Sequence, residues 1–78
     1  MNWRDRISVN PRVCHGKPCI KGTRVLVSVV LADVAAGESF DAIMSGYHIE
    51  HEDVQAALHY AAEIVDEIGM RIRRGATL

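Results

Sequence analysis

The sequence is poor in cysteine, proline and aromatic residues, and it has no long apolar run. Its 78 residues include two cysteines, two prolines, one tryptophan and one phenylalanine. Two cysteines cannot build the disulfide framework of a small secreted domain, so we expect reduced thiols.

The longest apolar run, residues 25–36, is interrupted by Ser28 and Asp33. It falls short of the ~20 residues that a membrane span requires. The N-terminal MNWRDRISVN lacks the apolar core of an export signal. We therefore expect a cytoplasmic protein that does not enter a membrane.

Lysine and arginine are missing from the middle of the chain. Residues 1–24 hold six basic residues and one acid, a net charge of +5. Residues 25–68 hold nine acids and no Lys or Arg, and residues 69–78 hold three arginines, giving −9 and +3. This distribution concerns the choice of partner rather than the fold. The basic segments favour an acidic partner such as nucleic acid, and the acidic middle favours a basic one.

The basic N-terminal part, residues 6–25, is predicted to form a β-ribbon. RISV (6–9), RVC (12–14) and CIK (19–21) are short β-like runs separated by turn-forming residues. The intervening HGKP fits the four-residue loop of a hairpin between the second and third runs. In that hairpin Cys14 and Cys19 would lie opposite each other.

Turn-forming residues explain the motif VCHGKPCIKGTRV, residues 13–25, without any ligand. Gly16 can adopt a positive φ, and Pro18 fixes its own φ while removing a backbone donor. Gly22 marks a second turn, and Thr23 is placed to hydrogen-bond locally. Three apolar side chains are expected to face the core and three basic ones to face outward: Val13, Ile20 and Val25, and Lys17, Lys21 and Arg24.

Three helices are predicted within residues 26–69. They cover about residues 27–36, 40–46 and 51–68, and residues 70–78 follow as a basic tail. Ser39 is a suitable N-cap for the second helix, while Gly46 and Gly69 mark the ends of the second and third. A short helix, a tight turn and a longer helix form the outline of a helix-turn-helix. The chain is thus predicted to be one mainly α domain, residues 1–78, with an N-terminal β-ribbon.

The first predicted helix is apolar around nearly its whole circumference. One face carries Val27, Val30, Leu31 and Val34, and the remainder carries Val29, Ala32 and Ala36. The third helix has apolar residues at three- and four-residue spacing: Val54, Leu58, Ala61, Val65 and Ile68. A short chain with an all-apolar helix needs a second molecule to cover it. We therefore expect a homodimer.

The side chains with metal or catalytic potential do not form a recognisable site. Cys14 and Cys19 form a single C-x4-C pair, and structural zinc needs a second pair of ligands. The two thiols can be reduced, bridged or metal-bound. The glycines lack phosphate-loop spacing, and His15 beside Cys14 is only a sequence neighbour. We expect no metal, no cofactor and no enzymatic activity.

Two groups of residues are candidates for contact with nucleic acid or a partner. The ribbon offers Arg12, Lys17, Lys21 and Arg24, and the start of the third helix offers His51 and Gln55. Basic side chains supply most of the affinity for phosphates, whereas Glu50, Glu52 and Asp53 would repel them. Any DNA contact is therefore expected through the ribbon more than through the third helix.

Three strings give the chain a family resemblance. These are GKP-x-I-x-GTRV at residues 16–25, AAGESFDAI at 35–43 and EDVQAALHYAA at 52–62. Over residues 6–62 the chain resembles the small prokaryotic family called domain of unknown function 433. It departs from the usual pattern at Tyr47-His48, where tyrosine-proline is common, and at Glu50, where a Thr or Ser cap is usual.

The resemblance implies a homeodomain-like helix-turn-helix core after the ribbon. It also implies an antitoxin similar to the VapB type, which neutralises a PIN-like ribonuclease and binds its own operator DNA. Two other functions stay open. The chain can be a stand-alone dimeric DNA-binding regulator, or a structural adaptor module without activity.

Overall fold

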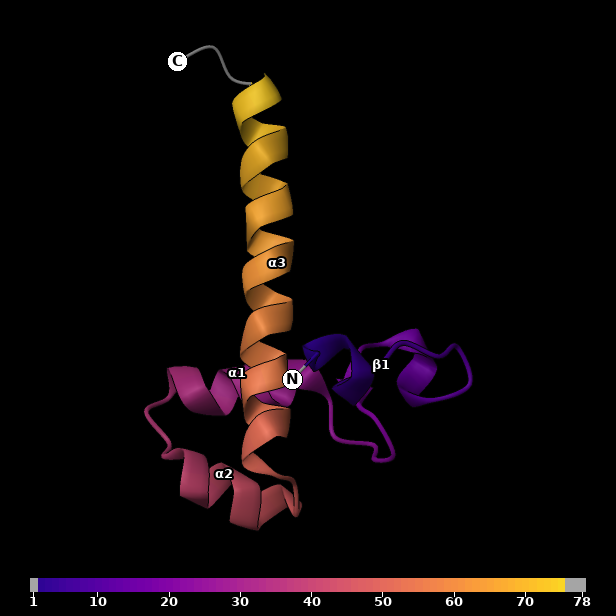
Figure 1. Cartoon of the computed structure of the whole chain (residues 1–78), viewed down its shortest axis with the longest axis vertical. Coiled ribbons are helices and arrows are strands. Elements are labelled where there is room, and N and C mark those ends of the chain that lie inside the picture. The colour runs from indigo at the N-terminus through magenta and orange to yellow at the C-terminus, as the bar shows by residue number, and fades with distance from the viewer. Residues whose placement is uncertain (1, 76–78) are drawn as a thin grey trace.

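The chain is mainly helical, with a small antiparallel sheet near its N-terminus. The computed structural model describes residues 2–75, with side chains as far as residue 69. The elements in chain order are the 3-10 helix η1 (Trp3–Arg6), β1 (Ile7–Ser8), the 3-10 turn η2 (Cys14–Gly16), β2 (Cys19–Ile20), α1 (Val27–Ala35), α2 (Phe40–Tyr47) and α3 (His51–Gly75). Figure 1 shows α1 and α2 around the first half of α3, with the sheet and its loops to one side. The predicted class, a mainly α fold with an N-terminal pair of strands, is confirmed.

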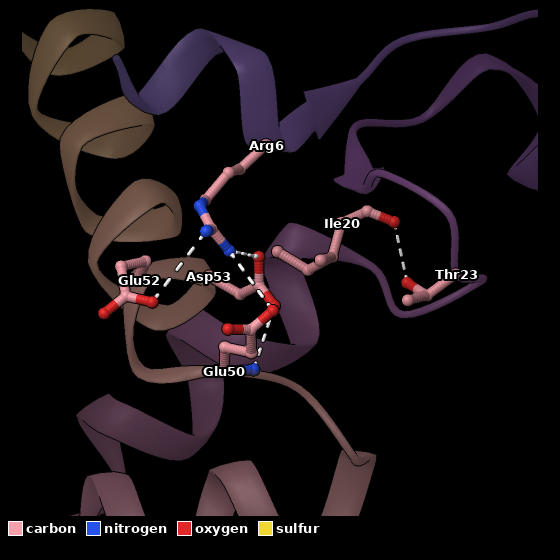
Figure 2. A network of polar contacts seen from close by, with 6 residues as sticks. All are labelled: Arg6, Ile20, Thr23, Glu50, Glu52 and Asp53. Atoms are coloured by element: carbon pink, nitrogen blue, oxygen red, sulfur yellow. Dashed lines mark hydrogen bonds and ion pairs between the residues drawn. The ribbon is translucent and has the colours of Figure 1, made fainter. Parts of the chain in front are cut away.

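The sheet joins two strands that are separated by the ten residues 9–18. Ile7 pairs with Ile20 and Ser8 with Cys19, and Cys19 also forms an isolated bridge with Leu26. Thr23 closes the following turn, because its hydroxyl donates to the carbonyl of Ile20 at 2.7 Å (Figure 2). The same hydroxyl accepts from the Val25 amide at 3.0 Å. The predicted local hydrogen bonding of Thr23 is confirmed.

The predicted hairpin across HGKP is wrong. Residues 12–14 form no strand, and β2 pairs with β1 instead. Cys14, His15 and Gly16 all have positive φ, at 52°, 56° and 79°. This left-handed run curls the backbone, and turn hydrogen bonds from the Gly16 amide to Val13 and from the Lys17 amide to Cys14 satisfy its polar groups. The backbone at residues 14–16 is therefore not extended, and it cannot take part in a strand ladder.

The first two helices lie close to their predicted bounds. α1 begins at Val27 as expected and ends at Ala35, one residue early. Ser39 caps α2, since its hydroxyl accepts from the Ala42 amide at 3.1 Å. Gly46 does not end α2, which runs on to Tyr47 and stops at His48, where φ is 56°. A histidine in the left-handed conformation therefore ends the helix, where a glycine had been predicted to end it.

The third helix is longer than predicted. α3 continues through Gly69 to Gly75, so the helix includes part of the expected basic tail, and residues 76–78 lie outside the described residues. An interior glycine costs a helix only about 1 kcal/mol relative to alanine, which is too little to end a long one.

The core lies where α1, α2 and the first half of α3 meet. Its buried members are Ile20, Val27, Val30, Ile43, Ile49, Val54 and Ala57. Val25, Leu31 and Val34 are partly buried against it, which confirms the predicted inner face of α1 and the inward orientation of Ile20 and Val25. Val13 is half-buried in the loop.

The second half of α3 rises away from the rest of the fold. Figure 1 shows this segment, residues 64–75, extending beyond the other described elements, and we call it the arm. Ile64, Val65 and Ile68, the apolar stripe of the arm, are exposed at 39%, 67% and 49%. Apolar side chains that the sequence pattern assigns to a helix face are here left outside the core. Along the described residues, no helix is both apolar and long enough to span a bilayer.

Candidate functional site

Arg6 ties the N-terminal segment to the start of α3. It stands at the end of η1, and its Nη1 donates to Asp53 Oδ1 at 3.0 Å. Glu50 and Glu52 each lie 3.8 Å from its guanidinium (Figure 2). The hydrogen bond with Asp53, above all, raises the pKa of Arg6. The three acids that were expected to repel phosphate are thus neutralised in part within the chain.

Asp53 also caps the helix that it belongs to. Its Oδ2 accepts from the amide of Glu50 at 2.9 Å, three residues back. This is the returning half of a capping box, in which the third residue of a helix bonds the amide of the cap residue. The usual Thr or Ser cap is replaced by Glu50, and Asp53 supplies the missing side-chain bond. The carboxylate is nearly buried, at 9% exposure for the residue.

The two candidate residues at the start of α3 lie beside apolar groups. The exposed His51 ring is tilted against Phe40, with 5.5 Å between centroids. Gln55 is half-buried and lines a hollow with Phe40, Leu58, His59 and Ala62. This surface therefore offers apolar area and two histidines instead of a basic groove.

The four basic candidates of the N-terminal part are all exposed, as expected of Lys17, Lys21 and Arg24. Arg12 lies in the turn that follows β1. The other three have different surroundings. Lys17 borders an apolar hollow beside Leu31 and Tyr60, while Lys21 borders the cluster of Arg6 and its acids. Arg24 lies at the hollow that reaches Cys19. Lys21 is thus the one of these three that is placed beside carboxylates.

The two cysteines are free thiols. Cys19 is buried with its Sγ 3.7 Å from the carbonyl of Thr23, and Cys14 is half-buried with its Sγ 3.6 Å from the carbonyl of Arg24. Burial first, and hydrogen bonding to Cys14 second, raise the pKa of Cys19. A raised pKa keeps a thiol protonated and weakly nucleophilic. The two thiols are not bridged to each other in the structure.

Two contacts of η1 brace α3 just before the arm, and neither was apparent from the sequence. Trp3 packs edge-on against Tyr60, with ring centroids 5.9 Å apart. Arg4 holds both carboxylate oxygens of Glu63, at 2.6 and 2.8 Å. The helix is supported up to residue 63, and the apolar stripe begins at the next residue. The spacing of Ala61, Val65 and Ile68 was the signal that a helix face continues there.

Among the described residues, three of the five exposed large apolar side chains thus lie together on the arm of a small helical domain with a two-stranded ribbon. The chain belongs to the family described as "Protein of unknown function (DUF433)", which matches residues 7–61. No protein with a curated description matches the chain.

Two solved structures share the fold. One is the crystal structure of a DUF433 member protein from Anabaena variabilis, with 28% identity and a TM-score of 0.73, over 88% of this chain and 69% of that chain. The other is the crystal structure of Rv2018 from Mycobacterium tuberculosis, with 30% identity and a TM-score of 0.64. That match covers 72% of this chain and 27% of the other, so this chain corresponds to about a quarter of Rv2018.

Proposed function

We propose that this protein is the antitoxin of a type II toxin–antitoxin pair, and that its arm masks a PIN-like ribonuclease. The observation that carries the proposal is the exposed apolar stripe on a helix that extends beyond its own core. Large exposed apolar side chains on a helix are typical of a segment that docks into a groove of a partner. The resemblance to VapB-type antitoxins supplies the kind of partner.

Charge on the arm supports a ribonuclease as that partner. Asp66 and Glu67 are exposed on the same turns as the apolar stripe. A ribonuclease has to attract phosphate, so its substrate cleft is basic. The part of the arm that carries the apolar stripe, residues 64–69, is acidic and amphipathic, although Arg71, Arg73 and Arg74 follow it in the sequence. An acidic, amphipathic segment suits a basic cleft in both shape and sign, which speeds association and favours the correct partner.

The α2–α3 pair supports a second, compatible activity. α2 ends at Tyr47 and α3 begins at His51, and a three-residue connection between two helices is typical of a helix-turn-helix. We propose a homeodomain-like arrangement of the three helices. Operator DNA would be contacted by the exposed Arg12, Lys17, Lys21 and Arg24, because the start of α3 is acidic.

The proposal predicts that a gene for a PIN-like ribonuclease lies next to this one, and the test uses the product of that gene. The purified nuclease is titrated with the full chain, and cleavage of a labelled RNA is followed. Cleavage should be abolished at an equimolar ratio. The double variant Val65→Glu/Ile68→Glu should require at least tenfold more protein, because it puts two charges into a desolvated groove.

The matched control is Val29→Glu, which places the same substitution on the exposed side of α1. This variant should mask the nuclease as well as the wild type does. Full RNA cleavage at saturating wild-type chain would refute the antitoxin function. The choice between the remaining functions, a stand-alone regulator or an adaptor module, would then depend on binding to upstream DNA.

A further inference from the structure

Cys14 and Cys19 place their thiols against the same short stretch of backbone. Cys14 Sγ lies 3.6 Å from the carbonyl oxygen of Arg24, and Cys19 Sγ lies 3.7 Å from that of Thr23. These carbonyls belong to successive residues, whose Cα atoms are only ~3.8 Å apart. Burial first, and then hydrogen bonding to the Cys14 thiol, raise the pKa of Cys19. The carbonyl contacts and the interaction between the thiols place the two sulfurs together as one pair.

The left-handed curl at residues 14–16 brings this pair together. Cys14 and His15 have φ of 52° and 56°, in a region that residues other than glycine rarely adopt. Such costly conformations persist where the surrounding structure holds them, and they are frequent at functional sites. Here the curl turns the chain so that the Cys14 thiol meets the turn at residues 23–24. The two thiols are thus neighbours, although the predicted hairpin that would have paired them is wrong.

The two thiols differ in access, and a hollow opens beside them. Cys19 is buried, at 1% exposure, whereas Cys14 is half-buried. A surface hollow of about 290 Å³ is lined by Cys19 together with Val13 and Arg24. The charge of Arg24 favours a thiolate at Cys19, against the effect of burial, and residues 6–32 hold no Asp or Glu. A small anionic thiol reagent can therefore approach the pair, and it meets Cys14 first.

The surroundings of the pair suit sulfur chemistry better than a metal. Structural zinc takes four ligands from Cys, His and carboxylate side chains. Within residues 2–69, where side chains are described, no three such side chains gather in one place. Two neighbouring thiols are sufficient for a disulfide.

We propose that Cys14 and Cys19 are a reversible disulfide site, closed by small-molecule disulfides such as glutathione disulfide and reopened by the corresponding thiols. The Cys14 thiolate attacks one sulfur of glutathione disulfide, whose S–S bond breaks, and one glutathione leaves. The Cys19 sulfur, having lost its proton, then attacks the Cys14 sulfur and expels the second glutathione. Two electrons pass from the protein to glutathione, and the two cysteine protons end on the two glutathione thiols.

The bridge tightens the loop between the two cysteines. It closes residues 14–19 into a ring and so restricts the unfolded chain. A domain of this size has a small stability margin, so the folded fraction follows the thiol–disulfide balance around the protein. The inference does not rest on the proposed function, because neither a nuclease nor DNA takes part.

The site is tested by equilibrating the full chain with mixtures of glutathione and glutathione disulfide and measuring its intact mass after acid quenching. The folded wild type should lose the mass of two hydrogens and retain little glutathione. Its ratio of bridged chain to mixed disulfide should exceed the ratio in denaturing urea by about tenfold or more, because the fold holds the sulfurs together. Equal ratios, or a folded chain that stays unreacted or stops at the glutathione adduct, would overturn the proposal.

Single-cysteine variants test the order of attack. Cys19→Ala keeps the half-buried thiol and should end as a stable glutathione adduct. Cys14→Ser keeps only the buried thiol and should form its adduct about tenfold more slowly. Circular dichroism checks that both variants are folded, and the wild-type measurement needs neither of them. Equal rates, or a faster reaction of Cys14→Ser, would contradict attack by Cys14 first.

Thermal unfolding tests the tightening of the loop. The Tm of the bridged wild type should exceed that of the reduced protein by roughly 5 °C, and dithiothreitol should reverse the change. Cys14→Ser is the matched control, and its Tm should be the same after both treatments. An unchanged or lower Tm of the bridged wild type would show that the bridge does not tighten the fold.

Discussion

Arg6 and Asp53, forty-seven positions apart in the chain, form a hydrogen-bonded ion pair with 3.0 Å between Nη1 and Oδ1. The same carboxylate caps α3 through the amide of Glu50. One side chain therefore fixes both the N-terminal segment and the turn that leads from α2 into α3. The pair also explains how three acids can gather at the start of one helix, where the helix dipole favours them as well.

Arg6→Ala should destabilise the fold markedly. Loss of the guanidinium leaves the nearly buried Asp53 beside two carboxylates and without its ion-pair partner, and only the exposed Lys21 borders the cluster. We expect the free energy of unfolding to fall clearly, and by more than on loss of an exposed ion pair, because a hydrogen bond to a charged group contributes more than an exposed pair. Urea denaturation followed by circular dichroism measures it.

Arg4→Ala is the control for that prediction. Arg4 pairs with Glu63, but both side chains are exposed, at 59% and 42%. Exposed ion pairs contribute about 0–1 kcal/mol. A loss of stability in Arg4→Ala that equals or exceeds the loss in Arg6→Ala would show that the cluster at the start of α3 does not hold the fold together.

The helices were largely predictable because their signals are local. Ser39 caps α2 through an amide three residues away, and the apolar spacing from Val27 to Val34 identifies the buried face of α1. The Arg6–Asp53 pair was not predictable, because it joins segments that only the folded chain brings together. The sequence showed a basic end and an acidic middle without showing that one neutralises part of the other.

Tyr47 should make stability fall at alkaline pH. Its hydroxyl donates to Asp33 Oδ2 at 2.5 Å, and this bond, ahead of burial, raises the pKa of Tyr47. A group with a raised folded pKa stabilises fully below its unfolded pKa, about 10 for tyrosine, and loses that contribution as pH rises through the folded value. The free energy of unfolding should therefore decline above about pH 10.

Tyr47→Phe isolates this contribution. At neutral pH it should lower the free energy of unfolding, because the hydrogen bond to a charged acceptor is lost. Its alkaline decline should be shallower than that of the wild type, because no phenol is left to ionise at this position. The raised pKa of Cys19 acts in the same direction in both proteins, so their difference reports Tyr47. Parallel pH profiles for the two proteins would refute the role of the Tyr47–Asp33 bond.

Operator binding should depend on the N-terminal basic residues. The variant Arg12→Gln/Lys17→Gln/Lys21→Gln/Arg24→Gln should lose most affinity for the upstream DNA in a mobility-shift assay at ~50 mM salt. The slope of log affinity against log salt should shrink by about 0.9 for each phosphate that the variant no longer neutralises. Both effects follow if these four side chains bind the DNA backbone.

His51→Ala/Gln55→Ala is the comparison variant. It should bind nearly as well as the wild type, because the start of α3 keeps a surplus of acid despite Arg6. Strong loss of binding in this variant, with full binding by the four-residue variant, would assign recognition to α3 and reject the ribbon.

Glycine and histidine show where local rules fail. Gly46 and Gly69 were predicted to end helices, and both lie inside them, because the cost of one glycine is small beside the packing or length of the helix. His48 ends α2 with a left-handed φ, a conformation that could not be predicted from a histidine in the sequence. The arm was missed for a related reason. Periodicity identifies a helix face, but it does not tell whether the core or another molecule covers that face.

The most direct test of the account is masking of the neighbouring ribonuclease by the arm, measured as RNA cleavage against added chain. We predict complete inhibition at an equimolar ratio by the wild type and by Val29→Glu, and at least a tenfold weaker effect of Val65→Glu/Ile68→Glu. Undiminished cleavage at saturating wild-type chain, or equal inhibition by the arm variant, would contradict the account.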